Sequence, residues 1–152
     1  MATNTERLAE LGIELPSVAK PVAAYVPAMR TGNLVFTSGQ LPFVDGELTH
    51  VGHVGAEVSP EEAKEAARTC ALNALAAAAA EVGLDNIVSV VKVVGFVNSA
   101  PGFNGQPGVI NGASELLGEI FGEAGQHARS AVGVNQLPLD TPVEVEIIVE
   151  VA

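Results

Sequence analysis

The stretch that decides the fold lies near the C-terminus and reads HARSAVGVNQLP over residues 127–138, followed by VEVE over residues 143–146. Apolar residues recur at every second position in both segments, and this alternation predicts two β-strands. Arg129 lies where the first strand begins, in a chain with only seven Lys and Arg against eighteen Asp and Glu. Because a planar guanidinium matches two carboxylate oxygens, Arg129 is a candidate anchor for a small carboxylate-bearing molecule.

The composition is that of an acidic globular protein. The 152 residues predict one domain, with 48% hydrophobic and 16% charged residues. A net charge of −11 argues against nucleic acids and anionic membranes as partners, since phosphate binding needs clustered Lys and Arg. Residues 6–14 carry four charged side chains where a signal peptide needs an apolar core, and no apolar run reaches membrane-spanning length. With a single cysteine, Cys70, we expect a protein of the reducing cytoplasm.

Hydrophobic periodicity and turn residues predict the order of the elements. Ser59, Pro60 and Glu62 combine a capping box with a first-turn proline, so a long helix is predicted to begin there and to end at Gly83. A second helix is predicted over residues 109–121, a short N-terminal helix over residues 3–11, and a hairpin turn at residues 45–46. The predicted strands cover residues 22–29, 33–38, 47–51, 87–97, 130–136 and 143–151.

This order predicts an α+β fold, in which two main helices pack on one face of a mixed β-sheet and a short N-terminal helix is added. The strand at residues 87–97 has apolar residues on both faces, so the face without helices also needs a cover. No remaining segment of the chain can provide one. We therefore expect a second copy of the chain to cover that face, in a homo-oligomer.

Strand alternation gives a first prediction for the site. If the valine-rich faces meet the helices, Arg129 and Glu144 both lie on the helix-free face. A simple hairpin between their strands would separate the two residues by about 20 Å. They could then share a pocket only across a subunit boundary or through a less simple connection. The alternative without a ligand is an interface salt bridge between Arg129 and one of the glutamates.

Other residues carry weaker signals. His50 and His53 could bind a metal, but no cysteine or carboxylate with matching spacing completes a zinc set, and we predict no metal. Cys70 lies among helical alanines and is predicted to be an inert core thiol. The glycine-rich segment 102–108 lacks the context of a phosphate-binding loop and is predicted to be a flexible rim beside a pocket. The spacing supports no Ser–His–Asp arrangement.

The chain resembles the RidA/YjgF family of reactive imine and enamine deaminases, formerly labelled endoribonuclease L-PSP-like. Three segments carry the resemblance: GNLVFTSGQLP at residues 32–42, Ile110-Asn111, and ARSxVxVxxLP at residues 128–138 with the VEVE that follows. The resemblance implies a chorismate-mutase-like fold and a homotrimer with a cleft at each subunit interface. It also divides the chain into an N-terminal helical extension at residues 1–19 and a RidA-like domain at residues 20–152.

The resemblance also implies an activity and a set of site residues. Members of this family hydrolyse reactive imines or enamines derived from amino acids to 2-keto acids and ammonia, without a metal or an organic cofactor. By position, Arg129 would clamp the substrate carboxylate, and Glu144 would handle the water or the proton as the second catalytic residue. The implied substrate contacts are Tyr25, Gly39, Asn111 and the backbone at Ala131.

The chain departs from the family pattern at three places. Ala131 stands where the best-known deaminases have cysteine, segment 98–108 is longer than in compact members, and the helix at residues 3–11 is additional. These departures leave a second function open, which is non-catalytic binding or sensing of a small keto acid in the same cleft. RNA cleavage, the activity in the older family label, is disfavoured by the net charge of −11 and the absence of a basic patch.

Overall fold

The computed structural model describes residues 2–18 and 24–152. Within these residues the chain forms three α-helices, three short 3-10 helices and seven strands. The α-helices are α1 (Asn4–Leu11), α2 (Pro60–Val82) and α3 (Gln106–Phe121), and the 3-10 helices are η1 (Leu84–Asn86), η2 (Gly122–Gly125) and η3 (Pro138–Asp140). The strands are β1 (Ala28–Thr31), β2 (Leu34–Thr37), β3 (Phe43–Val44), β4 (Glu47–Leu48), β5 (Ile87–Asn98), β6 (Ala128–Val134) and β7 (Val143–Val151).

Five of these strands form one mixed sheet in the order β1-β2-β7-β5-β6. Neighbours are antiparallel except for β5 and β6, which run parallel. A parallel pair needs a crossover connection, and α3 supplies it. Strands β3 and β4 form a separate hairpin around Asp45 and Gly46, whose φ angles are 52° and 84°. The predicted α+β class, the mixed sheet and the hairpin turn are confirmed.

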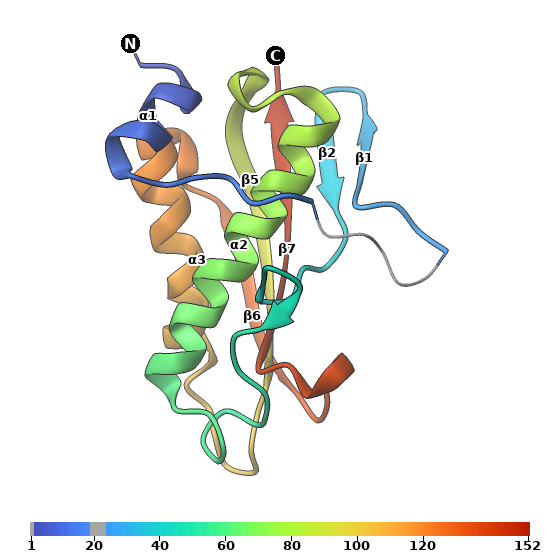
Figure 1. Cartoon of the computed structure of the whole chain (residues 1–152), viewed down its shortest axis with the longest axis vertical. Coiled ribbons are helices and arrows are strands. Elements are labelled where there is room, and N and C mark those ends of the chain that lie inside the picture. The colour runs from blue at the N-terminus through green and yellow to red at the C-terminus, as the bar shows by residue number, and fades with distance from the viewer. Residues whose placement is uncertain (1, 19–23) are drawn as a thin grey trace.

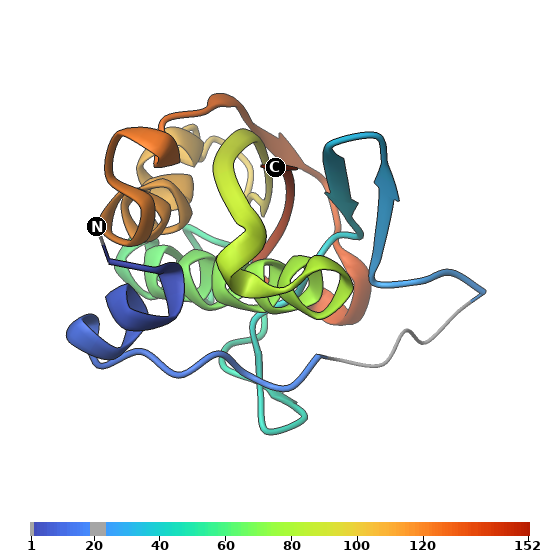
Figure 2. The ribbon, with the colours of Figure 1, turned by 90° about the horizontal axis from the view of Figure 1, so that it is seen from above.

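Helices α2 and α3 lie side by side over one face of the sheet (Figures 1 and 2). Alternate residues of β7, from Val143 to Val151, are buried beneath them. The helices approach each other closely because small residues line their contact, and a Cβ added at Gly112 would collide with the backbone carbonyl of Lys64. The predicted placement of both main helices on one face is confirmed.

The helix starts follow the local signals in the sequence. Ser59 caps α2 and forms the predicted capping box with Glu62. Thr3 and Glu6 form a second capping box at α1. Helix α1 is held against the rest of the chain by the Asn4 amide, which donates to the carbonyls of Leu84 and Ile87.

Several predicted boundaries were wrong. Residues 22 and 23 lie outside the described residues, and residues 24–27 form no strand, because Pro27 has no N–H to donate to a neighbouring strand. Strand β4 stops at Leu48 instead of continuing to residue 51. Helix α3 begins at Gln106, three residues earlier than predicted, with Pro107 in its first turn. The end of segment 102–108, which was predicted to be a flexible rim, is therefore helix.

A simple hairpin between the last two long strands does not form, because β5 lies between β6 and β7. The predicted face of Arg129 was also wrong. In the register of the sheet Arg129 lies beside the fully buried Val93, on the side covered by helices, whereas Val132 lies beside Phe96 on the helix-free side. Alternation alone could not distinguish the two faces, because on this edge strand the valines face away from the helices.

Candidate functional site

Arg129 projects from the edge strand β6 toward helix α3 and is held there by neutral acceptors. Its Nη1 donates to Asn111 Oδ1 at 2.8 Å and to Ser114 Oγ at 3.3 Å, and its Nη2 donates to the Pro107 carbonyl at 3.4 Å. All three acceptors belong to α3, which also carries the Asn111 expected from the family resemblance. The structure therefore brings Arg129 and Asn111 into direct contact.

The guanidinium retains binding capacity beyond these contacts. Arginine has five N–H donors, and three are used here, which leaves Nε–H and one Nη2–H. Among the described residues, no carboxylate forms a salt bridge with Arg129. The charge is thus positioned by the chain but not neutralised by the described part of it. This arrangement suits the binding of an external carboxylate.

Ser114 and His127 extend this polar group and were missed by the sequence analysis. Ser114 Oγ lies 2.8 Å from His127 Nε2, and His127 Nδ1 lies 2.6 Å from the Gly125 carbonyl. A carbonyl only accepts, so Nδ1 carries a proton, and in the neutral ring Nε2 accepts from the Ser114 hydroxyl. Ser114 can then accept from Arg129. Ser114 could have been found from the sequence, because Asn111 and Ser114 are polar and lie three residues apart, on the same side of one predicted helix.

Glu144 lies on the opposite, helix-free face of the sheet, beside Phe96. Burial raises the pKa of the half-buried Glu144 carboxyl, and the nearby charge of Glu146 raises it further. The carboxyl therefore holds its proton to a higher pH than an ordinary glutamate does. A carboxyl that keeps its proton in this way is a candidate acid–base group.

Gly39 and Tyr25 accompany Glu144. A Cβ at Gly39 would collide with the Glu144 carboxylate, so only glycine lets the carboxylate pack against the backbone there. The neighbouring Ser38 is tied to the segment of Tyr25, because its amide donates to the Pro27 carbonyl at 2.8 Å and its hydroxyl to the Val26 carbonyl at 2.5 Å. Tyr25 itself is 49% exposed.

The six predicted site residues therefore form two half-sites. The first, which we call the arginine half-site, contains Arg129, Asn111 and the half-buried Ala131, which follows Arg129 on the same face of β6. The second, the glutamate half-site, contains Glu144 and Gly39, and Tyr25 is assigned to it only through the bonds of Ser38 to the segment that carries Tyr25. Strand register and strand spacing place the Cα atoms of Arg129 and Glu144 about 14 Å apart, on opposite faces of the sheet. One copy of the chain cannot close both around a small molecule.

A separate group of side chains of the metal-ligating types lies beyond the other end of β6 from Arg129. His53, Glu57 and Asp140 place one ligand atom each within 4.8 Å of one another. From the sequence, His53 was a candidate metal ligand without a complete ligand set, because Asp140 is distant in sequence. His50 belongs to no such group among the described residues, and its Nε2 lies 3.5 Å from Glu62 Oε2.

This α+β chain is similar to several known proteins. A sequence model described as "YjgF/chorismate mutase-like, putative endoribonuclease" matches residues 5–151. The protein TCP17 of Trypanosoma cruzi is 45% identical over an alignment 152 residues long that covers 99% of this chain and 93% of TCP17. A RutC family protein of Pyrococcus abyssi is 31% identical over 85% of this chain and 87% of its own length. The chain belongs to the YjgF/RutC family.

Solved structures agree with this assignment. A protein of Shewanella oneidensis MR-1 superposes with a TM-score of 0.94 at 35% identity, over 99% of this chain and 100% of its own. Atu1372 of Agrobacterium tumefaciens gives a TM-score of 0.89 at 46% identity, over 96% of this chain and 91% of its own. The YjgF gene product of Escherichia coli gives 0.64 at 26% identity, over 89% of this chain and 98% of its own. The chorismate-mutase-like fold predicted from the sequence is confirmed.

The length and hydropathy of the helices bear on whether any of them could cross a bilayer. Among the helices of the described residues, none combines enough length with enough apolar character to cross a membrane.

Proposed function

We propose that the protein hydrolyses small reactive 2-imino acids, or their enamine tautomers, to 2-keto acids and ammonia. The proposal rests on the Arg129 guanidinium, which is oriented by three neutral acceptors and retains two unused N–H donors. A 2-imino acid presents the carboxylate that these donors match. Its C=N carbon is already electrophilic, so orientation and one acid–base group suffice for hydrolysis.

Glu144 is proposed as the acid–base group. Its raised pKa lets the carboxyl protonate the imine nitrogen, and the resulting carboxylate then accepts a proton from the attacking water. Water adds to the C=N carbon to give a carbinolamine. The Glu144 carboxyl then returns its proton to the nitrogen, and its carboxylate takes the hydroxyl proton as the C=O bond forms and the C–N bond breaks, which releases ammonia and leaves the keto group. Each turnover consumes one water and no cofactor.

The complete site is proposed to form between subunits of a homotrimer. The arginine half-site of one subunit would face the glutamate half-site of its neighbour, since the two lie on opposite faces of one sheet. The helix-free face also exposes apolar side chains that a neighbour would cover. Those more than 40% exposed are Met29, Phe36 and Val132.

We also propose that this activity operates in the cytoplasm. The only cysteine, Cys70, is fully buried, and burial raises the pKa of its thiol well above the ordinary value. A free thiol in the core suits a reducing compartment.

The direct test is keto-acid release from 2-iminobutyrate generated in situ. The wild type and Arg129→Ala are compared with Arg30→Ala, in which an exposed arginine outside both half-sites is removed. We expect acceleration by the wild type and Arg30→Ala and background rates for Arg129→Ala. Full activity in Arg129→Ala would refute the proposal that Arg129 anchors the substrate carboxylate. A wild type that binds 2-ketobutyrate without accelerating hydrolysis would instead favour the sensing function.

A further inference from the structure

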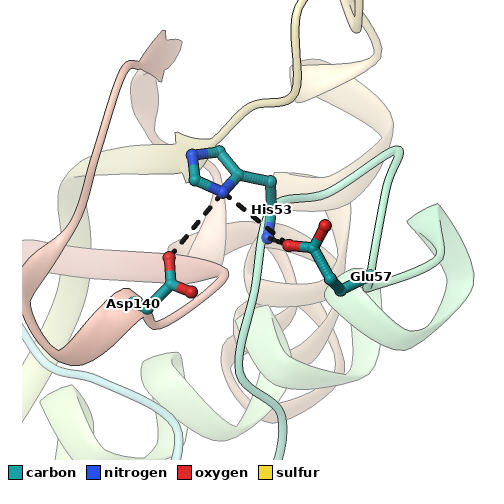
Figure 3. Close-up of side chains that lie close together, drawn as sticks. All are labelled: His53, Glu57 and Asp140. Carbon is teal, nitrogen blue, oxygen red and sulfur yellow. Dashed lines mark hydrogen bonds and ion pairs between the residues drawn. The ribbon is translucent and has the colours of Figure 1, made fainter.

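His53, Glu57 and Asp140 form a compact group of side chains that the proposed deaminase does not use (Figure 3). His53 Nδ1 lies 3.7 Å from Asp140 Oδ1 and 3.8 Å from Glu57 Oε1. The histidine and Glu57 belong to the loop before α2, and Asp140 ends η3 just before β7. We call these three residues the His53 cluster.

The hydrogen bonds of His53 determine which ring nitrogen faces the carboxylates. Its Nε2 lies 3.0 Å from the Asn135 carbonyl, which can only accept, so Nε2 carries the proton. In the neutral ring Nδ1 then carries no proton, and it lies beside two carboxylate oxygens with its lone pair free. Three electron-rich atoms that converge in this way can hold a cation between them. Histidine ligands in metal sites are oriented in the same manner, by donation from the other ring nitrogen to a carbonyl.

The spacing within the His53 cluster fits a metal ion better than a shared proton. Separations of 3.7 and 3.8 Å are too long for an N–H···O hydrogen bond. In a tetrahedral site with bonds of about 2.0–2.1 Å, the ligand atoms lie about 3.3 Å apart. His53 Nδ1 would need to approach each carboxylate oxygen by only about 0.5 Å to reach this spacing, and all three ligand atoms already lie within 4.8 Å of one another.

Both carboxylates are held in place by neighbouring groups. The His53 amide donates to Glu57 Oε1 at 2.9 Å. Asp140 Oδ1 accepts from Gln136 Nε2 at 2.8 Å and from Asn98 Nδ2 at 2.9 Å. Such supporting hydrogen bonds orient metal ligands before the ion arrives.

Asn98 provides an independent observation. This side chain is fully buried and reaches Asp140, yet its Oδ1 is the one buried side-chain polar atom without a partner among the described residues. Its amide lies 3.3 Å from the Gly52 carbonyl as well. The Nδ2 group donates to Asp140, so the unpartnered Oδ1 belongs to the side chain that holds this carboxylate. A buried oxygen without a partner is an exception that an ion or ligand bound beside the His53 cluster would account for.

We propose that the His53 cluster binds one first-row divalent transition-metal ion of the zinc type. One imidazole nitrogen and two carboxylate oxygens form a donor set that suits such an ion. Magnesium is a poorer match, because it prefers oxygen ligands and dehydrates reluctantly. The ion would join the loop before α2 to the turn that leads into β7, and it would stabilise the fold.

The test is zinc titration of the full chain after chelator treatment and dialysis, with any affinity tag removed. We expect the wild type to bind one Zn²⁺ per chain with a Kd below about 10 μM, and zinc to raise its melting temperature. His53→Ala and Asp140→Asn should each weaken binding at least about tenfold and abolish the shift in melting temperature. Circular dichroism confirms that both variants are folded.

His50→Ala is the matched control, because it removes a half-buried histidine that faces a single carboxylate, Glu62. We expect it to bind zinc as the wild type does. Absence of zinc binding by the wild type below millimolar concentration would overturn the proposal. Equal binding by the wild type and both cluster variants would overturn it too, because the zinc would then be bound elsewhere.

Discussion

Two inactive variants, Arg129→Ala and Glu144→Gln, are expected to restore activity to each other when their subunits are mixed. The structure places Arg129 and Glu144 on opposite faces of one sheet, with Cα atoms about 14 Å apart. A small imino acid cannot reach both from a single subunit. Each cleft would therefore take Arg129 from one subunit and Glu144 from its neighbour.

The size of the recovery follows from this arrangement. In a random equal mixture, half of the subunits offer an intact Arg129 and half offer an intact Glu144. A cleft is complete only when both intact residues meet, so about one quarter of the clefts should be active in any cyclic assembly. We therefore expect about one quarter of the wild-type rate of keto-acid release.

The assay mixes the two variants under denaturing conditions, refolds them together and measures 2-iminobutyrate hydrolysis. An equal mixture of the wild type with the double variant shows whether subunits exchange, because its activity is about one half without exchange and about one quarter with it. If this control shows exchange while the mixture of single variants stays at background, the two residues do not complement each other across an interface. The inter-subunit site would then be refuted.

Three further predictions concern single substitutions. Because the pKa of Glu144 is raised in the folded state, the stability that this carboxyl contributes is lost as pH rises from the ordinary glutamate pKa through the raised one. Urea unfolding should therefore show Glu144→Gln gaining stability relative to the wild type over that pH range. A stability difference between the two proteins that does not change with pH would contradict this. Gly112→Ala should lower the free energy of unfolding by about 1–3 kcal/mol, measured by urea denaturation, because the new methyl group meets the Lys64 carbonyl. Asn111→Ala should raise the KM for 2-iminobutyrate about tenfold, because Arg129 loses its 2.8 Å acceptor; an unchanged KM would show that Asn111 does not orient the guanidinium.

Features that depend on neighbouring residues in the chain could be predicted from the sequence. The capping box of α2 involves residues three apart, and the turn at residues 45–46 needs only two residues that accept positive φ. The two-helix layer followed from the apolar stripes of α2 and α3. The family resemblance supplied Arg129, Asn111, Glu144 and their companions as site candidates.

Features that depend on strand order could not be predicted in the same way. Alternation shows that Arg129 and Val132 face opposite sides of β6, but it does not say which side the helices cover. That side is determined by the crossover through α3, which places β6 at the sheet edge beside β5. The contact between Ser114 and His127 also depends on this crossover, as does the distance between Arg129 and Glu144.

The proximity of Asp140 to His53 could not be predicted from the sequence either. The two residues are far apart in sequence, and Asp140 reaches the His53 cluster through a turn in which Leu139 and Asp140 have φ angles of 58° and 56°. Non-glycine residues seldom adopt positive φ. No local pattern in the sequence predicts such a turn.

The central claim is that Arg129 anchors the carboxylate of a small 2-imino or 2-keto acid. The most direct measurement is calorimetric titration of 2-ketobutyrate into the assembled wild type, Arg129→Ala and Arg30→Ala. We expect one binding site per chain in the wild type and Arg30→Ala, and no measurable binding in Arg129→Ala. Binding of 2-ketobutyrate to Arg129→Ala with the wild-type affinity would contradict it.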